Sequence, residues 1–302
     1  MEIISPVTGS SNTSLIRDIA VSDLISLYRK DHQLDIRPYF GDLQTIQLMQ
    51  CNDTGYRFFY PFTIFGDDAF YQHLQQSDLY YLKEKWEYDK TISLIGDHQK
   101  VLEIGSGAGY LMEKLTAKGN CRVLTGLELN TKAVQSSKAR GLNVINATIE
   151  DFAKDNAGAF DVAYALQVLE HVTNVRSFLT ASLDALRPGG RLIICVPNNN
   201  PYLYRHDFFH TLNLPPHHAG LWNRASFGKL PDFFPMRLNN VFIEPLSDHK
   251  EWYQTQVSYL KERHHPAAGI LSAVPATLYK NTLRLLKNFI EGRNIMVEFV
   301  KI

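Results

Sequence analysis

The chain has 302 residues, with 31 Lys and Arg against 31 Asp and Glu, and 45% of its residues are hydrophobic. This length can bury a sizeable core, and the composition excludes a disordered chain. Phosphate binding uses clustered Lys and Arg, so a zero formal net charge without a strongly basic block argues against nucleic acid as the main partner.

The cysteine pattern and the apolar segments bear on the cellular compartment. Cys51, Cys121 and Cys195 are odd in number and far apart, which indicates a reducing compartment and not a disulfide framework. No stretch stays apolar for the roughly 18 residues that a membrane span needs, and the first residues do not resemble a secretion signal. These features predict a cytoplasmic protein without a membrane span.

The first 76 residues lack the regular alternation of strands and helices, and their polar and aromatic side chains are scattered. They predict a short helix at 21–30 and a hairpin at 44–61, and we assign 1–76 to an accessory module. A helix over 77–95 then leads into a core domain that we place at 77–246.

Strand-like and helix-like segments alternate from about residue 99 to 198. Short apolar strands are predicted at 100–104, 121–129, 142–149, 160–166 and 191–197, with helices between them. A parallel strand pair needs a long crossover, so this alternation predicts βαβ units in a parallel α/β sheet.

The last part of the chain predicts a helix at 222–230, a strand at 237–245, two helices at 249–263 and 268–290, and a closing strand at 293–302. We interpret 247–291 as a helical cap and 292–302 as the last core strand. Apolar positions at helical spacing in the cap favour packing on the core or a homodimer contact over peripheral contact with a membrane.

A glycine-rich loop, EIGSGAG at Glu103–Gly109, lies where a strand passes into a helix. Small residues allow a ligand to approach the backbone, and the N–H groups at a helix start favour polar or anionic groups. Glu128 ends the next strand 23 residues after Gly105, a spacing that places a carboxylate on a ribose. The loop therefore predicts a nucleoside-containing cofactor.

The loop also discriminates between cofactors. The dinucleotide fingerprint requires glycine where Tyr110 stands, and Glu103 would repel a pyrophosphate but attract the ammonium of a methionine group. This pattern favours S-adenosylmethionine. A nicotinamide-dependent oxidoreductase is the alternative, and titration with both cofactors distinguishes the two.

Five blocks within residues 98–198 resemble the class I S-adenosylmethionine-dependent methyltransferases: VLEIGSGAG, GLELN, NATIEDF, FDVAYALQVLEHV and LRPGGRLIICVPN. The resemblance implies a Rossmann-like, doubly wound, mostly parallel seven-stranded sheet. It also implies that Gly105, Ser106 and Gly107 line the methionine half and that Glu128 holds the ribose. Thr148 and Ile149 would flank the adenine, and Gln167 would lie near the sulfonium. With Glu103 and Gly109 of the same glycine loop, these are the nine candidate cofactor residues. Thr148 departs from the family, which often has Asp there.

Two N-terminal segments, SPVTGSSN and CNDTGYRFFYP, resemble the knuckles of a zinc-binding module that precedes some sugar-modifying methyltransferases. The ligand positions would be Ser5, Thr8, Cys51 and Thr54. Hydroxyls and one thiol do not supply the four ligands of structural zinc, so we expect a degenerate, zinc-ribbon-like module without metal. An unrelated irregular module is the alternative.

Histidines concentrate beyond the parallel strands, since seven of the eleven lie between residues 206 and 265. The segment LPPHHAGLWNRASF resembles a stretch that borders the acceptor site in the same subgroup. An alcohol acceptor benefits from a base with a pKa near 7, so His171, His217 and His218 are the candidate catalytic residues. Packing or capping roles are the alternatives.

Glu170 and His171 also resemble part of a metal-binding constellation in some quinone O-methyltransferases. Gln167 stands where a further glutamate is expected there, so we predict no metal. The subgroup resemblance implies methyl transfer to a small molecule, most directly to a hydroxyl of a sugar or sugar-linked metabolite. A quinone or phenol O-methyltransferase and a non-catalytic S-adenosylmethionine-binding protein are the alternatives.

Overall fold

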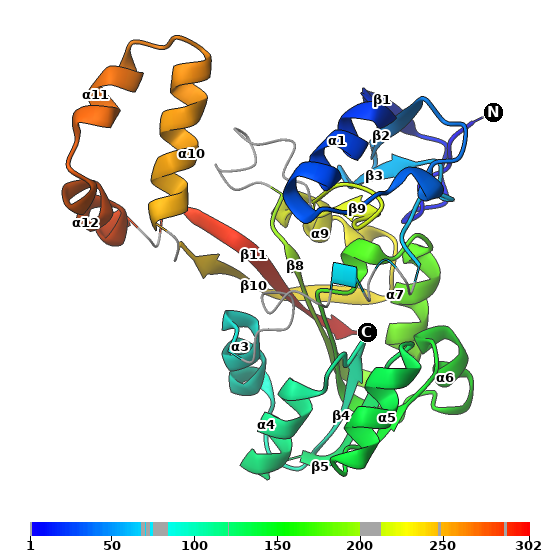
Figure 1. Cartoon of the computed structure of the whole chain (residues 1–302). Helices are drawn as coiled ribbons and strands as arrows, with labels where there is room; N and C mark the ends of the chain where they lie inside the picture. Colours follow the sequence, from blue (N-terminus) through cyan, green and yellow to red (C-terminus); the bar gives the residue numbers. More distant parts are fainter. Residues whose placement is uncertain are drawn as a thin grey trace.

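The computed structural model describes residues 2–67, 70, 73–74, 84–119, 121–199, 213–246, 249–286 and 289–302. These residues form a seven-stranded core sheet, a four-stranded N-terminal sheet and a helical cap (Figure 1). The domain boundary predicted at residues 76 and 77 lies outside the described residues.

The core sheet confirms the predicted α/β architecture. In spatial order the strands are β10 (Met236–Pro245), β11 (Glu291–Lys301), β8 (Leu186–Pro197), β7 (Phe160–Leu166), β4 (Gln99–Ile104), β5 (Cys121–Leu127) and β6 (Val144–Ile145). The last five strands in this order run parallel to one another. Strand β11 runs antiparallel to β8, and β10 runs antiparallel to β11.

Helices cover both faces of this sheet because successive strand residues point to opposite sides. Helices α3 (Trp86–Leu94) and α4 (Tyr110–Lys118) belong to a cluster with Val101, Tyr164 and Ile193. The neighbouring strand residues form the opposite cluster, with α6 (Ile149–Asp155) and α7 (Val175–Asp184) packed on Leu102, Ala163 and Ile194. Helix α5 (Thr131–Ala139) packs beside α4, near β6.

The third predicted strand is wrong in its extent. It was expected over 142–149, but β6 contains only Val144–Ile145, and Ile149 begins α6. The Thr148 hydroxyl caps that helix by accepting a hydrogen bond from the Asp151 backbone N–H at 3.1 Å. The apolar residues alone suggested a strand up to residue 149, but the threonine cap starts a helix there.

The N-terminal sheet confirms the predicted hairpin and contains strands that the sequence did not indicate. Its order is β1 (Thr13–Ala20), β2 (Thr45–Cys51), β3 (Arg57–Tyr60) and β9 (Gly220–Leu221). One face packs against α1 (Val21–His32), and the other face contributes Met49, Cys51 and Phe58 to the core cluster. Strand β9 comes from the chain between β8 and β10, so this sheet is tied to the core.

The helical cap consists of α10 (His249–Glu262), α11 (Ala267–Ala273) and α12 (Ala276–Leu286). Pro275 separates α11 from α12, so the single helix predicted at 268–290 is wrong. Leu283 packs against Leu246, whereas Leu285 and Phe289 are more than four-fifths exposed. Contact of this surface with a membrane or a second copy stays a prediction.

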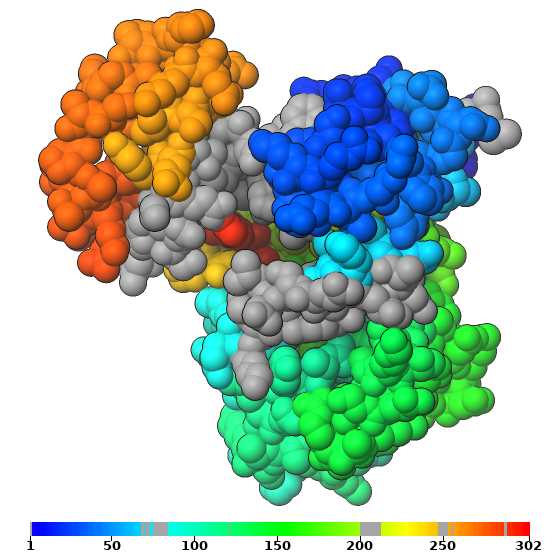
Figure 2. Space-filling model, in the orientation of Figure 1, coloured from blue at the N-terminus to red at the C-terminus, as the bar shows by residue number. Residues whose placement is uncertain are grey.

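In space-filling view the N-terminal sheet and α1 (blue) lie above the core domain, and the cap (orange) lies beside them (Figure 2). Within the described residues, no helix combines the length and apolar character that crossing a bilayer requires.

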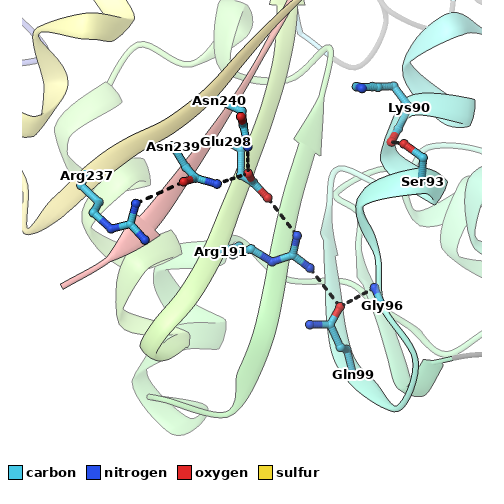
Figure 3. Close-up of polar contacts among 9 residues, drawn as sticks. All are labelled: Lys90, Ser93, Gly96, Gln99, Arg191, Arg237, Asn239, Asn240 and Glu298. Carbon is cyan, nitrogen blue, oxygen red and sulfur yellow. Dashed lines mark hydrogen bonds and ion pairs between the residues drawn. The ribbon is translucent and has the colours of Figure 1, made fainter.

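An ion pair with a buried carboxylate joins the antiparallel edge to the parallel strands (Figure 3). Glu298 of β11, 2% exposed, accepts hydrogen bonds from Arg191 at 2.9 Å and from Asn239 and Asn240 at 2.6 Å each. Burial opposes ionisation, but these hydrogen bonds outweigh it and lower the pKa of Glu298. Arg191 also donates to Gln99, which links β8 to the start of β4.

Candidate cofactor and acceptor site

The glycine loop connects β4 to α4 at the carboxyl edge of the core sheet. Gly105, Gly107 and Gly109 have φ angles of 75°, 51° and 74°, a region that favours glycine. A Cβ on Gly105 would lie 2.5 Å from the Cγ2 atom of Val168, in the turn after β7. The Val168 side chain thus occupies the space that a Cβ would need, so both the φ angle and the close packing of this turn require glycine at position 105.

Glu128 lies against this loop, as the spacing predicted. One carboxylate oxygen accepts a hydrogen bond from the Gly107 N–H at 2.7 Å, and the other accepts from the Asn130 N–H at 2.8 Å. These bonds fix the carboxylate at the end of β5. Its remaining lone pairs suit the hydroxyl pair of a ribose.

Glu103 and Ser106 provide the test of whether the site fits S-adenosylmethionine. Glu103 Oε2 and the Ser106 hydroxyl are buried, and neither has a hydrogen-bond partner among the described residues. Burial raises the pKa of Glu103 to about 8, the Tyr164 hydroxyl lowers it, and the charge of Glu128 adds to the increase. A cationic ammonium bound beside Glu103 would compensate its buried carboxylate, so this residue fits the methionine half of the cofactor.

The other predicted cofactor residues are held in different ways. Thr148 caps α6, and the Ile149 side chain is 2% exposed in the core. Gln167 has a φ of 56° and donates from its side chain to Asn294 at 3.2 Å. Contacts of these three residues with the adenine and the sulfonium stay predictions.

The three candidate catalytic histidines meet at one place. His171 ends the turn Leu169–His171 after β7, and His217 and His218 come from the segment before β9. The ring of His171 lies 4.8 Å from that of His217 and 4.9 Å from that of His218, centroid to centroid. The sequence predicted all three residues as candidates, and the fold places His171 beside His217, which follows 46 positions later in the chain.

The histidine pair and the neighbouring Glu170 are buried. His217 and His218 are 7% and 5% exposed, and Glu170 is 1% exposed. Burial lowers the pKa of His171 to about 4, against the opposing effect of the His217 carbonyl, so this imidazole is neutral near pH 7. Burial likewise raises the pKa of Glu170 to about 8, its own backbone N–H lowers it, and Glu87 raises it further.

The four residues expected at the degenerate zinc positions also meet. Ser5–Gly9 and Cys51–Gly55 form matching turns, in which the glycine N–H donates to the first residue's carbonyl at 2.9 and 2.8 Å. The Thr8 hydroxyl lies 3.7 Å from the Cys51 sulfur. Burial raises the pKa of the Cys51 thiol, but hydrogen bonds from Ser5, Thr54 and Thr8 outweigh that effect and lower it. The relation of this module to zinc ribbons stays a prediction.

Comparisons with known proteins support the cofactor assignment. The family model described as "Methyltransferase domain" matches residues 79–245, more than half of the chain. A ubiquinone biosynthesis O-methyltransferase from Vibrio atlanticus is 33% identical over 125 residues, which cover 39% of this chain and 51% of that protein. A protein of the same name from Dechloromonas aromatica is 32% identical over 133 residues, covering 42% and 55%. The chain thus spans about half the length of these relatives.

A crystal structure of a SAM-dependent methyltransferase from Archaeoglobus fulgidus aligns with a TM-score of 0.52 and 14% identity, covering 78% of this chain and all of that chain. At this identity the alignment establishes the fold. Together with the matched family model and the buried Glu103 beside the glycine loop, these findings show that the chain belongs to the methyltransferase-domain family and is a class I methyltransferase that uses S-adenosylmethionine.

Proposed function

We propose that the protein methylates a ring hydroxyl of a phenol or quinol. The observation that carries this proposal is the similarity to ubiquinone biosynthesis O-methyltransferases, whose names specify oxygen as the methylated atom. The matched family model spans residues 79–245, which include the glycine loop. A ring hydroxyl suits this site because it is more acidic than an alcohol and needs less assistance to lose its proton.

The proposed reaction is the attack of the acceptor oxygen on a methyl carbon. S-adenosylmethionine supplies that methyl group on a sulfonium, which leaves as a neutral thioether when the new C–O bond forms. Glu103 and Glu128 would orient the donor, and the imidazole of His218 would accept the proton that the acceptor oxygen loses. His171, His217 and His218 belong to the segments that follow β7 and precede β9, so they border the same sheet edge as the glycine loop.

A sugar hydroxyl is the second candidate acceptor. It derives from the resemblance of the N-terminal module and of the LPPHHAGLW segment to the sugar-modifying subgroup. The matching turns at Ser5–Gly9 and Cys51–Gly55 favour this alternative. The two relatives described above carry a different acceptor in their names, which is why we place the phenolic acceptor first.

The test is an acceptor screen with purified protein and labelled S-adenosylmethionine, with catechols, polyprenylated phenols and nucleotide-linked sugars in separate reactions. We expect labelled product with a phenolic acceptor. The variant His218→Ala should lower kcat by roughly 10²–10⁴-fold, the usual contribution of proton transfer, while the Kd for S-adenosylmethionine is unchanged. Labelling of sugars alone would contradict the phenolic assignment.

His264→Asn is the matched control in this screen. His264 is exposed in the cap at a φ of 49°, which asparagine also tolerates, and it lies outside the histidine cluster. Its kcat should equal that of the parent enzyme. An equal loss of turnover in His264→Asn would show that the assay reports damage to the fold and not the loss of a particular imidazole.

A further inference from the structure

We infer that Gln167 distinguishes the methyl donor from the spent cofactor, and that Asn294 and Glu244 act behind it as positioning residues. The side-chain oxygen of Gln167 would contact the positively charged sulfonium of S-adenosylmethionine. The neutral sulfur of S-adenosylhomocysteine would not gain from that contact. This inference concerns the donor alone, so it does not depend on which acceptor the protein methylates.

Gln167 lies at the part of the sheet edge where the donor sulfur belongs. In S-adenosylmethionine the sulfur joins the methionine chain to the ribose, so it would lie between an ammonium beside Glu103 and a ribose beside Glu128. The glycine loop spans this interval, and the Val168 side chain fills the space beside Gly105. Gln167 precedes Val168 and directly follows β7, the strand next to β4, so it borders the same part of the loop.

The backbone of Gln167 adopts a conformation that favours glycine. Its φ is 56°, and its N–H donates to the Cys195 carbonyl at 2.7 Å, which ties the turn to β8. Residues other than glycine that are held in this region cluster at ligand and catalytic sites, where neighbouring contacts compensate the strain. The glutamine side chain is thus present against the preference of its own backbone, which points to a role for its amide.

A chain of two amides and one carboxylate fixes the Gln167 side chain. Glu244 of β10 accepts a hydrogen bond from Asn294 Nδ2 at 2.9 Å, and Asn294 Oδ1 accepts one from Gln167 Nε2 at 3.2 Å. An ionised carboxylate can only accept, so Glu244 determines which end of the Asn294 amide faces Gln167. As a result, Gln167 must turn its nitrogen toward Asn294.

The oxygen of the Gln167 amide is the group that remains for a ligand. Among the described residues, Oε1 has no hydrogen-bond partner, whereas Nε2 contacts Asn294 and lies 3.9 Å from the Cys195 sulfur. A carbonyl oxygen carries partial negative charge, and it attracts the positive C–H groups around a sulfonium. The opposite orientation of the amide would present N–H groups to the same cation and repel it.

This arrangement would make the site sensitive to the charge on the sulfur. Methyl transfer converts the sulfonium to a neutral thioether, so the attraction to Gln167 Oε1 is lost once the methyl group has left. The contact therefore adds to the affinity for the donor and not to that for the product. Weaker retention of S-adenosylhomocysteine would favour its exchange for a new donor molecule.

The experiment measures the Kd values of S-adenosylmethionine and S-adenosylhomocysteine for the full-length protein by calorimetric titration. Gln167→Gly suits the positive φ and removes the amide. We expect this variant to bind S-adenosylmethionine roughly three- to tenfold more weakly, with less than about a twofold change for S-adenosylhomocysteine. Gln167→Asn also tolerates this φ but is one methylene shorter, so it should show the same selective loss.

Glu244→Gln tests the positioning role. Glutamine can donate as well as accept, so the Asn294 amide is no longer held in one orientation, and some molecules present Gln167 Nε2 to the cofactor. We expect a selective loss for S-adenosylmethionine that is smaller than the loss in Gln167→Gly. The double variant should lose no more than Gln167→Gly alone, because Glu244 acts through the Gln167 side chain.

Gln33→Gly and Glu262→Gln are the matched controls, and both should keep the parental Kd values. Gln33 is an exposed glutamine with a φ of 53° at the end of α1, and Glu262 is exposed in the cap. Equal weakening of both ligands in the Gln167 variants, or an unchanged ratio of the two Kd values, would overturn the inference. Additive losses in the double variant would overturn the role of Glu244. No acceptor is present in these titrations, so a failed phenol screen leaves their outcome intact.

Discussion

The Glu103→Gln variant should bind S-adenosylmethionine roughly 10–100-fold more weakly than the parent protein. Glu103 is buried with an unsatisfied carboxyl oxygen, and a hydrogen bond to a charged group contributes about 1.5–3 kcal/mol. Glutamine keeps the size of the side chain but cannot carry the negative charge that pairs with an ammonium. Calorimetric titration measures the Kd, and Glu262→Gln, an exposed position in the cap, should leave it unchanged.

The affinity for S-adenosylmethionine should also depend on pH through the same residue. The free carboxyl has a pKa of about 8, and the bound ammonium favours its ionised form, so binding below pH 8 releases a proton. Affinity should therefore rise up to about tenfold per pH unit as the pH increases toward 8, and then level off. Glu103→Gln should show no such rise. A parallel rise in the variant would assign the pH dependence to another group.

The free energy of unfolding of the cofactor-free protein should fall as the pH increases, whereas the affinity for S-adenosylmethionine rises. The folded pKa of Glu103 exceeds its usual value of 4.5, so between these values the folded state binds more protons than the unfolded state. The free energy of unfolding of the parent should then fall by up to about 1.4 kcal/mol per pH unit in this range through this group. Glu103→Gln should escape that decrease and be the more stable protein near pH 8, as urea unfolding would show.

Trp222→Ala should lower the free energy of unfolding by about 3–5 kcal/mol, the usual cost of removing a large buried aromatic side chain. Trp222 is fully buried, stacked on Phe227 at 4.7 Å and packed against Tyr56 at 4.2 Å. It also follows the histidine pair closely in the chain. The substitution should therefore reduce kcat as well, because the segment that carries the histidine pair loses the packing of Trp222 against Tyr56 and Phe227.

Urea unfolding followed by circular dichroism measures the effect of Trp222→Ala. Leu129→Ala is the matched control, since Leu129 is 60% exposed in the turn after β5 and its truncation should change stability by less than about 0.5 kcal/mol. A loss below about 1 kcal/mol in Trp222→Ala would show that this side chain does not join the N-terminal sheet to the core in solution.

The sequence alone was sufficient for the core sheet and the cofactor loop because both depend on local signals. Strands β4, β5, β7 and β8 are apolar runs flanked by helices, and the loop between Glu103 and Gly109 has the glycine spacing of a strand-to-helix turn that binds a nucleoside cofactor. The position of Glu128 beside Gly107 followed from the same reasoning, because both lie at carboxyl ends of neighbouring parallel strands.

The acceptor side was less predictable because its contacts are long-range. His171 could be named from its motif, but its packing against the His217 and His218 rings depends on how the chain returns from β8. Asn213 and the buried state of Glu170 carried no sequence signal, since an isolated asparagine or glutamate is most often at the surface. Strand β9 is two residues long, too short for any pattern to indicate.

That short strand has a consequence for how the protein is made. Phe58 pairs with Gly220, so the edge of the N-terminal sheet stays open while the ribosome synthesises the whole parallel part of the core. During synthesis β3 presents unpaired N–H and C=O groups, a template for incorrect pairing with another nascent chain. Closure of this edge is thus a late event of folding, and it coincides with the arrival of the histidine pair just before β9.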